Sequence, residues 1–343
     1  MSKKVRIGKV TIGGGERIAV QSMTNTPTSD AEATLEQIAE LAVRGCDIVR
    51  SSVPDSASAK AFKTICEKSP LPVVADIHFD YKLAIAAIEN GAAKVRINPG
   101  NLGGESNLRA VADCLKAHRI PVRVGVNGGS LDKKYAALPP AEAMCESALE
   151  YCSMLEKYGV YDIVVSVKSS CVKDMVDCNR LLSQRCGYPL HLGVTEAGLY
   201  TQGLVKSAIG IGSLLLDGIG DTIRVSLTDD PVKEVDAACE ILKAINLYGK
   251  PYVEIISCPT CARTEIDVKG LAEKVREYTS RVNKNLQIAV MGCVVNGIGE
   301  SSHCDIGVAG GREKSALFRD GKILRTVPNE ELMQALLTEI DKL

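Results

Sequence analysis

The chain has 343 residues, with 41 Lys and Arg against 42 Asp and Glu, no Trp and three Phe. A net charge of −1 and so few aromatic side chains argue against nucleic-acid binding, which usually needs a basic excess and stacking aromatics. No apolar run approaches the ~20 residues of a membrane span, and no apolar signal-peptide region follows the basic segment Met1–Arg6. We therefore expect a cytoplasmic protein.

Residues 18–246 repeat a short apolar, β-branched run followed by a longer segment with helical spacing. Such alternation predicts parallel strand pairing, and eight units are the number in a closed (β/α)8 TIM barrel of ~250 residues. A doubly wound open sheet is the competing fold. The predicted helices include Ala31–Arg44, Tyr81–Asn90, Ala141–Tyr158 and Pro231–Ile245. The predicted strands are Ile18–Met23, Asp47–Arg50, Pro72–Ile77, Lys94–Asn98, Pro121–Asn127, Asp162–Lys168, Pro189–Thr195 and Thr222–Leu227.

Polar side chains lie near the carboxyl end of every predicted strand, and five of the eight ends carry a cation. These ends converge on one face of a barrel, where such enzymes place their active sites. Because Arg and Lys bind phosphate through charge-assisted hydrogen bonds, the pattern predicts a phosphorylated substrate. Ion pairing with nearby Asp and Glu is the structural alternative. The five cations, here called the cationic cluster, are Arg50, Arg96, Arg123, Lys168 and Arg224. Other polar residues at these ends are Gln21, Ser22, Asp76, His78, Asn98, Asn127, Glu196 and Ser226.

The remainder of the chain reads as a small α+β domain, so we place the domains at residues 1–248 and 249–343. It combines predicted strands with a charged helix and a closing amphipathic helix. The predicted helices are Val268–Arg281 and Asn329–Leu343. The predicted strands are Tyr252–Ser257, Gln287–Met291, Asp305–Ala309 and Lys322–Val327.

Thirteen cysteines, an odd number spread over a long chain, indicate reduced thiols rather than a disulfide scaffold. Ten of them lack ligand spacing with one another, and we interpret them as small hydrophobic residues. The other three are Cys258 and Cys261, two residues apart, and the remote Cys293 next to Gly292. Thiolates in such arrangements hold iron–sulfur clusters. A zinc site is the alternative, and it needs a fourth ligand such as His303 or Cys304.

Seven motifs distributed over the full chain resemble one enzyme family, the 4-hydroxy-3-methylbut-2-enyl diphosphate synthases of the methylerythritol phosphate route to isoprenoids. The motifs occur in both predicted domains, which makes the resemblance specific. They are Gln21–Thr26, Ala75–Phe79, Val95–Asn101, Val122–Asn127, Val194–Gly198, Ser257–Cys261 and Gly292–Gly297.

The resemblance implies an iron–sulfur oxidoreductase that opens the ring of 2-C-methyl-D-erythritol 2,4-cyclodiphosphate and removes a hydroxyl group as water. Electrons would come singly from flavodoxin or ferredoxin, and the enzyme would be a head-to-tail homodimer. The implied ligands of a [4Fe–4S] cluster are Cys258, Cys261, Cys293 and Glu300. The implied acid/base group is Glu196. The implied substrate contacts are Arg50, His78, Arg96, Arg123, Asn127, Lys168, Arg224, Ser226 and Asn296.

One departure from the family pattern lies beside the proposed cluster. The family usually has Gly-Pro-Gly-Glu where this chain has Gly297-Ile298-Gly299-Glu300. Pro would stiffen that loop, so Ile298 leaves the position of Glu300 less constrained. An iron–sulfur sensor or scaffold protein that binds an anionic effector is the alternative to an enzyme. Such a sensor would not need a carboxylate such as Glu196 among the cations.

Overall fold

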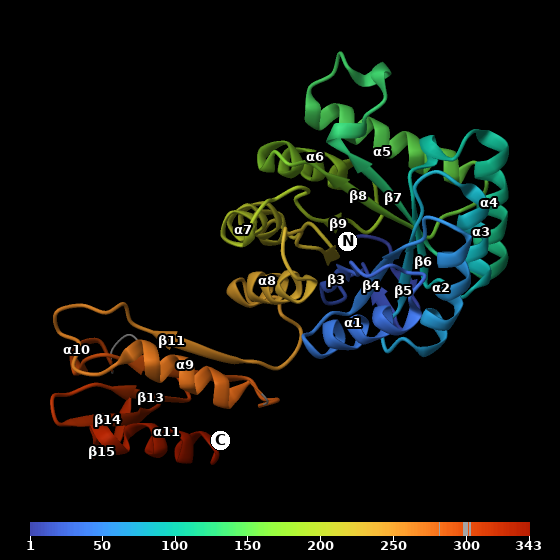
Figure 1. Ribbon diagram of the computed structural model, residues 1–343. Helices are drawn as coiled ribbons and strands as arrows, with labels where there is room; N and C mark the ends of the chain where they lie inside the picture. Colours follow the sequence, from blue (N-terminus) through green and yellow to red (C-terminus); the bar gives the residue numbers. More distant parts are fainter. Residues whose placement is uncertain (281, 298–300, 302) are drawn as a thin grey trace. The chain divides into compact units, whose positions relative to one another are not determined.

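The structure is a computed structural model that describes residues 1–280, 282–297, 301 and 303–343. The chain forms two units, Met1–Gly249 and Lys250–Leu343, each with a hydrophobic core of its own (Figure 1). None of the helices in the described residues combines the length and the hydropathy that crossing a membrane requires.

The first unit is a barrel of eight parallel strands, and a helix follows each strand. The strands pair in the order β8-β7-β6-β5-β4-β3-β10-β9. A parallel bridge between Val165 of β8 and Leu190, just before β9, closes the circle. The expected (β/α)8 fold is therefore confirmed. The strands are β3 (Ala19–Met23), β4 (Ile48–Ser52), β5 (Val73–Asp76), β6 (Lys94–Ile97), β7 (Val122–Asn127), β8 (Ile163–Lys168), β9 (His191–Leu192) and β10 (Thr222–Ile223). The helices are α1 (Ala31–Val43), α2 (Ser56–Lys68), α3 (Tyr81–Glu89), α4 (Glu105–His118), α5 (Pro140–Glu156), α6 (Val172–Arg185), α7 (Tyr200–Leu216) and α8 (Pro231–Ala244).

Side chains alternate along each strand between the surrounding helices and the barrel interior. In β6, Val95 and Ile97 belong to the apolar core that strands and helices share, so Lys94 and Arg96 face inward. Branched apolar residues usually fill the interior of such a barrel. Here charged side chains occupy the middle of the barrel and its part nearest the carboxyl ends of the strands. This departure indicates that the interior is a binding site.

A short antiparallel hairpin, β1 (Val5–Ile7) and β2 (Val10–Ile12), closes the barrel at the amino-terminal ends of its strands. Its apolar side chains pack against residues near the starts of the strands. This lower layer is apolar, so the charged interior opens only toward the carboxyl ends. The cluster consists of Val5, Ile7, Ile12, Ala19, Ile48, Val74 and Val164.

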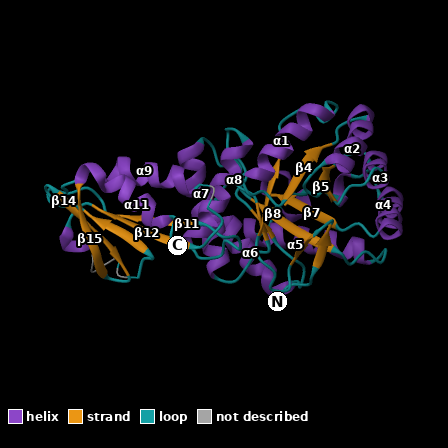
Figure 2. Cartoon of the chain, turned by 90° about the horizontal axis from the view of Figure 1, so that it is seen from below, coloured by secondary structure: helices purple, strands orange, loops and turns teal. Residues whose placement is uncertain are grey.

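The second unit is a five-stranded sheet in the order β11-β12-β13-β14-β15. The first three strands run parallel, and β14 and β15 are antiparallel to their neighbours. Helices α9 and α11 pack on one face of the sheet and share an apolar core with it (Figure 2). The strands are β11 (Val253–Ser257), β12 (Leu286–Met291), β13 (Ile306–Ala309), β14 (Lys314–Arg319) and β15 (Lys322–Pro328). The helices are α9 (Val268–Thr279), α10 (Val294–Gly297), the 3-10 turn Asn329–Glu331 and α11 (Leu332–Ile340).

Three local predictions differ from the structure. Strands β9 and β10 are two residues each, shorter than the predicted Pro189–Thr195 and Thr222–Leu227. Strand β14 was not predicted, since Lys314–Arg319 contains no β-branched residue. Helix α9 ends at Thr279, and the predicted end, Arg281, lies outside the described residues.

Candidate active site

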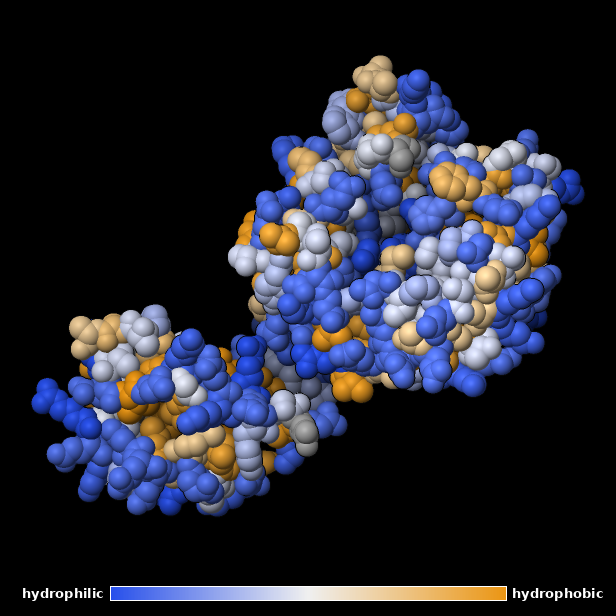
Figure 3. Space-filling view, in the orientation of Figure 1, coloured by the Kyte–Doolittle hydropathy of each residue, from blue (hydrophilic) through white to orange (hydrophobic). Residues whose placement is uncertain are grey.

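The cationic cluster lies inside the barrel near the carboxyl ends of its strands, as predicted. Asp76, Arg96 and Arg123 are in register on the adjacent strands β5, β6 and β7. Arg50, Arg96, Arg123 and Lys168 are all buried, and Arg123 is 1% exposed. The structure thus brings together side chains that are far apart in the sequence. In Figure 3 hydrophilic residues (blue) line the hollow in this face of the first unit.

Two glycines leave space for these cations. A Cβ atom on Gly125 of β7 would lie 2.6 Å from Arg96 Nε, and one on Gly193 would lie 2.9 Å from Lys168 Nζ. A glycine inside a strand weakens it and often marks a close approach. Gly125 and Gly193 could therefore have indicated the site in the sequence, but the site was predicted only from the polar residues at the strand ends.

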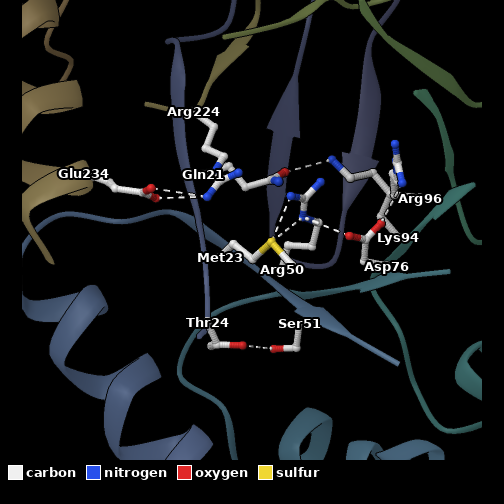
Figure 4. A network of polar contacts seen from close by, with 10 residues as sticks. All are labelled: Gln21, Met23, Thr24, Arg50, Ser51, Asp76, Lys94, Arg96, Arg224 and Glu234. Carbon is white, nitrogen blue, oxygen red and sulfur yellow. Dashed lines mark hydrogen bonds and ion pairs between the residues drawn. The ribbon is translucent and has the colours of Figure 1, made fainter. Parts of the chain in front are cut away.

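Two buried carboxylates contact the cationic cluster. Asp76 Oδ1 accepts a hydrogen bond from Arg96 Nη1 at 3.2 Å, and Asp76 Oδ2 lies 3.6 Å from Arg50 Nε (Figure 4). Glu234 binds Arg224 at 3.2 Å. Burial alone would raise the pKa of Asp76, but the charges of Arg50 and Arg96 outweigh it and hold that pKa below its usual range. Glu234 was missed in the sequence because it lies on α8, away from any strand end.

Positive charge remains in excess after this pairing. Arg50 keeps its charge near neutral pH, although burial lowers its pKa to about 10. Among the described residues, Nε and Nη1 of Arg123 and Nε of Arg96 have no hydrogen-bond partner, although all three atoms are buried. Buried polar groups in native proteins nearly always have partners. The geometry therefore fits an anion that accepts hydrogen bonds from several guanidinium groups at once.

A sixth basic side chain, Lys94, lies deeper in the barrel and was not predicted as a site residue. Its side chain is fully buried, and its Nζ donates to Gln21 Oε1 at 3.3 Å (Figure 4). Burial lowers the pKa of Lys94 well below its usual value, and the charges of Arg123 and Arg50 act in the same direction. The sequence could have predicted this position. Lys94 precedes Arg96 by two residues in one strand, and residues i and i+2 lie on the same face of a strand.

A cavity of about 480 Å³ opens at the ends of β7, β8 and the segment after β9. Asn127 and Glu196, two predicted site residues, line it. Glu196 is an exposed residue with φ of +51°, a conformation that non-glycine residues seldom adopt. Such backbone strain concentrates at functional sites. The other lining residues include Leu131, Met144, Ser169, Ser170, Asp174 and Thr195.

His78 and Ser226 follow strand ends of the same barrel face but do not line this cavity. His78 is exposed after β5, beside Phe79, with ring centroids 6.1 Å apart. Ser226 lies two residues beyond Arg224 and is partly buried. Neither residue contacts the cationic cluster through a side-chain hydrogen bond within the described residues.

The three predicted thiols follow the carboxyl ends of two adjacent parallel strands in the second unit. Ser257 pairs with Val290, so Cys258 and Cys293 leave the sheet at the same end. Gly292 N–H donates to Cys258 Sγ at 3.1 Å, and the exposed Cys261 donates its own N–H to Thr264 Oγ1 at 3.0 Å. In the described part of the chain, no three His, Cys, Asp or Glu residues form a group that could hold a single metal ion.

Cys304 lies at the other end of this sheet. Asp305 N–H donates to the Gln287 carbonyl, which places Cys304 beside the start of β12, whereas Cys258 lies beside its end. The separation along the strands is about five residues, or roughly 16 Å. Cys304 is fully buried among apolar side chains, and burial raises the pKa of its thiol.

Two further predicted site residues follow Cys293 in the sequence. Asn296 belongs to α10, and Glu300 lies outside the described residues.

Comparison with known proteins gives the same architecture. Residues 2–239 match the model of the GcpE TIM-barrel domain, and residues 254–342 match that of the GcpE protein C-terminal domain. Dihydropteroate synthases of Xanthomonas albilineans and Yersinia pestis share the barrel fold, with TM-scores of 0.51 and 0.52 at 19% and 11% identity. The match to the Xanthomonas albilineans enzyme covers 71% of this chain and 99% of that chain, and the match to the Yersinia pestis enzyme covers 72% and 100%.

Curated relatives match along the whole chain. A protein of Caldanaerobacter subterraneus is 53% identical over 347 residues, covering 100% of this chain and 97% of the relative. One of Clostridium perfringens is 52% identical over 344 residues, covering 99% and 98%. Both are named 4-hydroxy-3-methylbut-2-en-1-yl diphosphate synthase (flavodoxin). With both domain models matched in order, the chain belongs to the GcpE family.

Proposed function

We propose that this protein is a 4-hydroxy-3-methylbut-2-en-1-yl diphosphate synthase that receives electrons from flavodoxin. It would open the ring of 2-C-methyl-D-erythritol 2,4-cyclodiphosphate reductively and remove one hydroxyl group as water. The relatives that match the full chain carry the name of this enzyme. The barrel of this chain contains side chains suited to such a compact diphosphate.

The excess of buried positive charge carries this proposal. The cationic cluster and Lys94 together have four arginines and two lysines, and two buried carboxylates, Asp76 and Glu234, contact the arginines. Each charge-assisted hydrogen bond to a phosphate oxygen contributes about 1.5–3 kcal/mol. Several such bonds offset the free energy needed to bury these cations. A diphosphate supplies oxygen acceptors for Nε and Nη1 of Arg123 and Nε of Arg96, which have no partner among the described residues.

Glu196 is the proposed acid/base group. It lines the cavity at the ends of β7 and β8, and these strands also carry Arg123 and Lys168. A carboxylate there can hold or release a proton at the carbon skeleton while the cations hold the diphosphate. Asn127, which lines the same cavity, is a proposed substrate contact together with His78, Ser226 and Asn296.

Cys258, Cys261, Cys293 and Glu300 are the proposed ligands of a [4Fe–4S] cluster. The three thiols fit this group because they extend from one end of the sheet, and the Gly292 N–H donates to a sulfur, as is common around such clusters. Cys304 does not fit, because it lies at the opposite end of the strands. Such a cluster supplies electrons one at a time to the bound substrate.

A head-to-tail homodimer would complete the site. The chain leaves the barrel at the face opposite to the cationic cluster, since Gly249 packs against Arg17, which pairs with Asp47 at the start of β4. We therefore propose that the second unit of one chain serves the barrel of its partner.

The test is product formation under anaerobic conditions from the cyclic diphosphate with reduced flavodoxin. Product that appears only when both reductant and reconstituted iron are present supports the proposal. Turnover without electrons or iron would indicate a metal-dependent lyase on the same fold. Tight substrate binding without product under reducing conditions would instead support a sensor.

A further inference from the structure

Glu234 is a buried carboxylate that contacts the cationic cluster from a helix. It lies in the first turn of α8, and its side chain is 5% exposed. Arg224 Nη2 donates to both of its oxygens at 3.2 Å, as Figure 4 shows. One end of the guanidinium is therefore held by Glu234. Arg224 Nε is buried and has no hydrogen-bond partner among the described residues.

The same carboxylate fixes the loop between β10 and α8. The Leu227 N–H donates to Glu234 Oε1 at 2.9 Å, and the Thr228 N–H donates to the Gly198 carbonyl at 3.0 Å. Leu227 packs over Gly203 of α7, where a Cβ atom would lie 2.4 Å from Leu227 Cδ2. Ser226 lies within this fixed loop, so Glu234 connects two proposed diphosphate contacts.

The surroundings of Arg224 are otherwise cationic. Its charge interacts with those of Arg50 and Arg123, and both interactions are repulsive. Arg has many rotamers, so without a partner the side chain would move away from these charges or sample several positions. Glu234 supplies the attraction that opposes this.

We propose that Glu234 is a positioning residue for the diphosphate. It holds the Arg224 guanidinium and the Ser226 loop in their binding positions before the anion arrives, so that binding does not have to order them. This inference rests on the proposed function, because it takes Arg224 and Ser226 as diphosphate contacts. Ordering a flexible side chain on binding costs free energy, and preorganisation removes that cost.

The opposing interpretation is that Glu234 only neutralises charge. A carboxylate near an anion site repels the anion, so its removal would then strengthen diphosphate binding. The two interpretations therefore predict opposite signs for the same substitution.

The experiment measures the affinity of inorganic pyrophosphate by titration calorimetry at fixed pH and ionic strength. The variants are E234A, E234Q, R224A and the double variant R224A/E234A. The matched control is E240Q, an exposed residue of α8 that pairs with Lys243. Iron content and the thermal unfolding midpoint are recorded for each protein. Should E234A fail to fold, E234Q carries the test, because Gln keeps an acceptor for the Leu227 N–H.

We expect E234A to weaken binding about five- to tenfold, E234Q to weaken it less, and E240Q to leave it unchanged. Adding E234A to R224A should weaken binding less than adding it to the parent, because only the contact of Glu234 with the Leu227 N–H then remains to be lost. In turnover, E234Q should raise KM while kcat stays close to that of the parent. Unchanged or stronger binding by E234A overturns the inference, and so does an E234A effect that is as large in the R224A background as in the parent.

Failure of the proposed function gives a different result. If the parent protein does not bind pyrophosphate, the cationic cluster is not a diphosphate site and the inference falls with it. If the parent binds pyrophosphate and E234A binds it equally well, only the role of Glu234 is wrong.

Discussion

Arg96 fills the space that a side chain at position 125 would need, since a Cβ atom on Gly125 would lie 2.6 Å from Arg96 Nε. Strand β7 therefore contributes both a cation, Arg123, and the gap beside it that accommodates the cation of β6. This relationship explains how bulky guanidinium groups from adjacent strands fit into one barrel.

Gly125→Ala should displace Arg96 from this gap. We expect weaker pyrophosphate binding and a loss of about 1–3 kcal/mol in the free energy of unfolding, as for other overpacked interiors. Calorimetric titration and chemical denaturation measure the two effects. The control is Gly212→Ala on α7, where no neighbouring atom is close and Ala should stabilise the helix by about 0.5–1 kcal/mol. Parent-like binding and stability in the Gly125 variant would show that Arg96 has room to move.

Arg123→Ala should raise KM while the iron content stays normal. Arg123 is the most deeply buried member of the cationic cluster, and two of its nitrogens lack partners among the described residues. The loss of one charge-assisted contact of about 1.5–3 kcal/mol corresponds to a KM increase of about 10- to 150-fold. Arg109→Ala, on the exposed face of α4, is the control. Loss of iron from the Arg123 variant would contradict the assignment of separate substrate and cluster residues.

Cys304→Ser should keep the iron content, the visible absorption and the turnover close to those of the parent. The reason is its position at the amino-terminal end of β13, away from Cys258. Glu300→Ala should retain a cluster bound by three thiolates and lose most activity. Iron analysis and absorption spectra distinguish the variants. Iron loss from the Cys304 variant together with normal turnover of the Glu300 variant would overturn the ligand assignment.

A mixture of Glu196→Gln and Cys293→Ser chains should recover part of the activity that each variant lacks alone. Recovery follows if one chain supplies an intact barrel and its partner supplies an intact cluster. The measurement uses co-expressed, differently tagged chains purified as mixed dimers. Mixed dimers without activity would argue for a site contained within one chain.

Substrate binding should take up protons at Lys94 and Lys168. Burial lowers the pKa of both lysines, and the neighbouring charges, Arg123 and Arg50 for Lys94 and Arg224 and Arg123 for Lys168, lower it further. A bound anion favours the protonated amine and raises both pKa values. Affinity should therefore fall as the pH rises above the pKa values of the free protein.

Calorimetry of cyclic diphosphate binding in buffers with different ionisation enthalpies measures this uptake, because the ligand has no proton that titrates near neutrality. Lys94→Met should reduce the uptake. Identical binding enthalpies in all buffers would show that both lysines are already charged in the free protein.

The sequence alone determined the barrel, the position of the cationic cluster and the placement of three thiols beyond the same ends of two adjacent strands. Eight strand–helix repeats specify parallel pairing. Each helix carries the chain back to the end of the sheet at which the preceding strand began, so the next strand runs in the same direction. The carboxyl ends of parallel strands must then converge. Arg50, Arg96 and Arg123 could therefore be placed together without any knowledge of side-chain contacts.

Only the tertiary structure decided which groups contact these cations. Glu234 reaches Arg224 from a helix, and Lys94 meets Gln21 across the barrel. Such contacts depend on the strand register and on the close packing of strands and helices, which no local pattern contains. The same holds for Cys304. Its spacing from Cys293 is that of a plausible ligand, but the parallel pairing of β12 and β13 places it at the far end of the sheet.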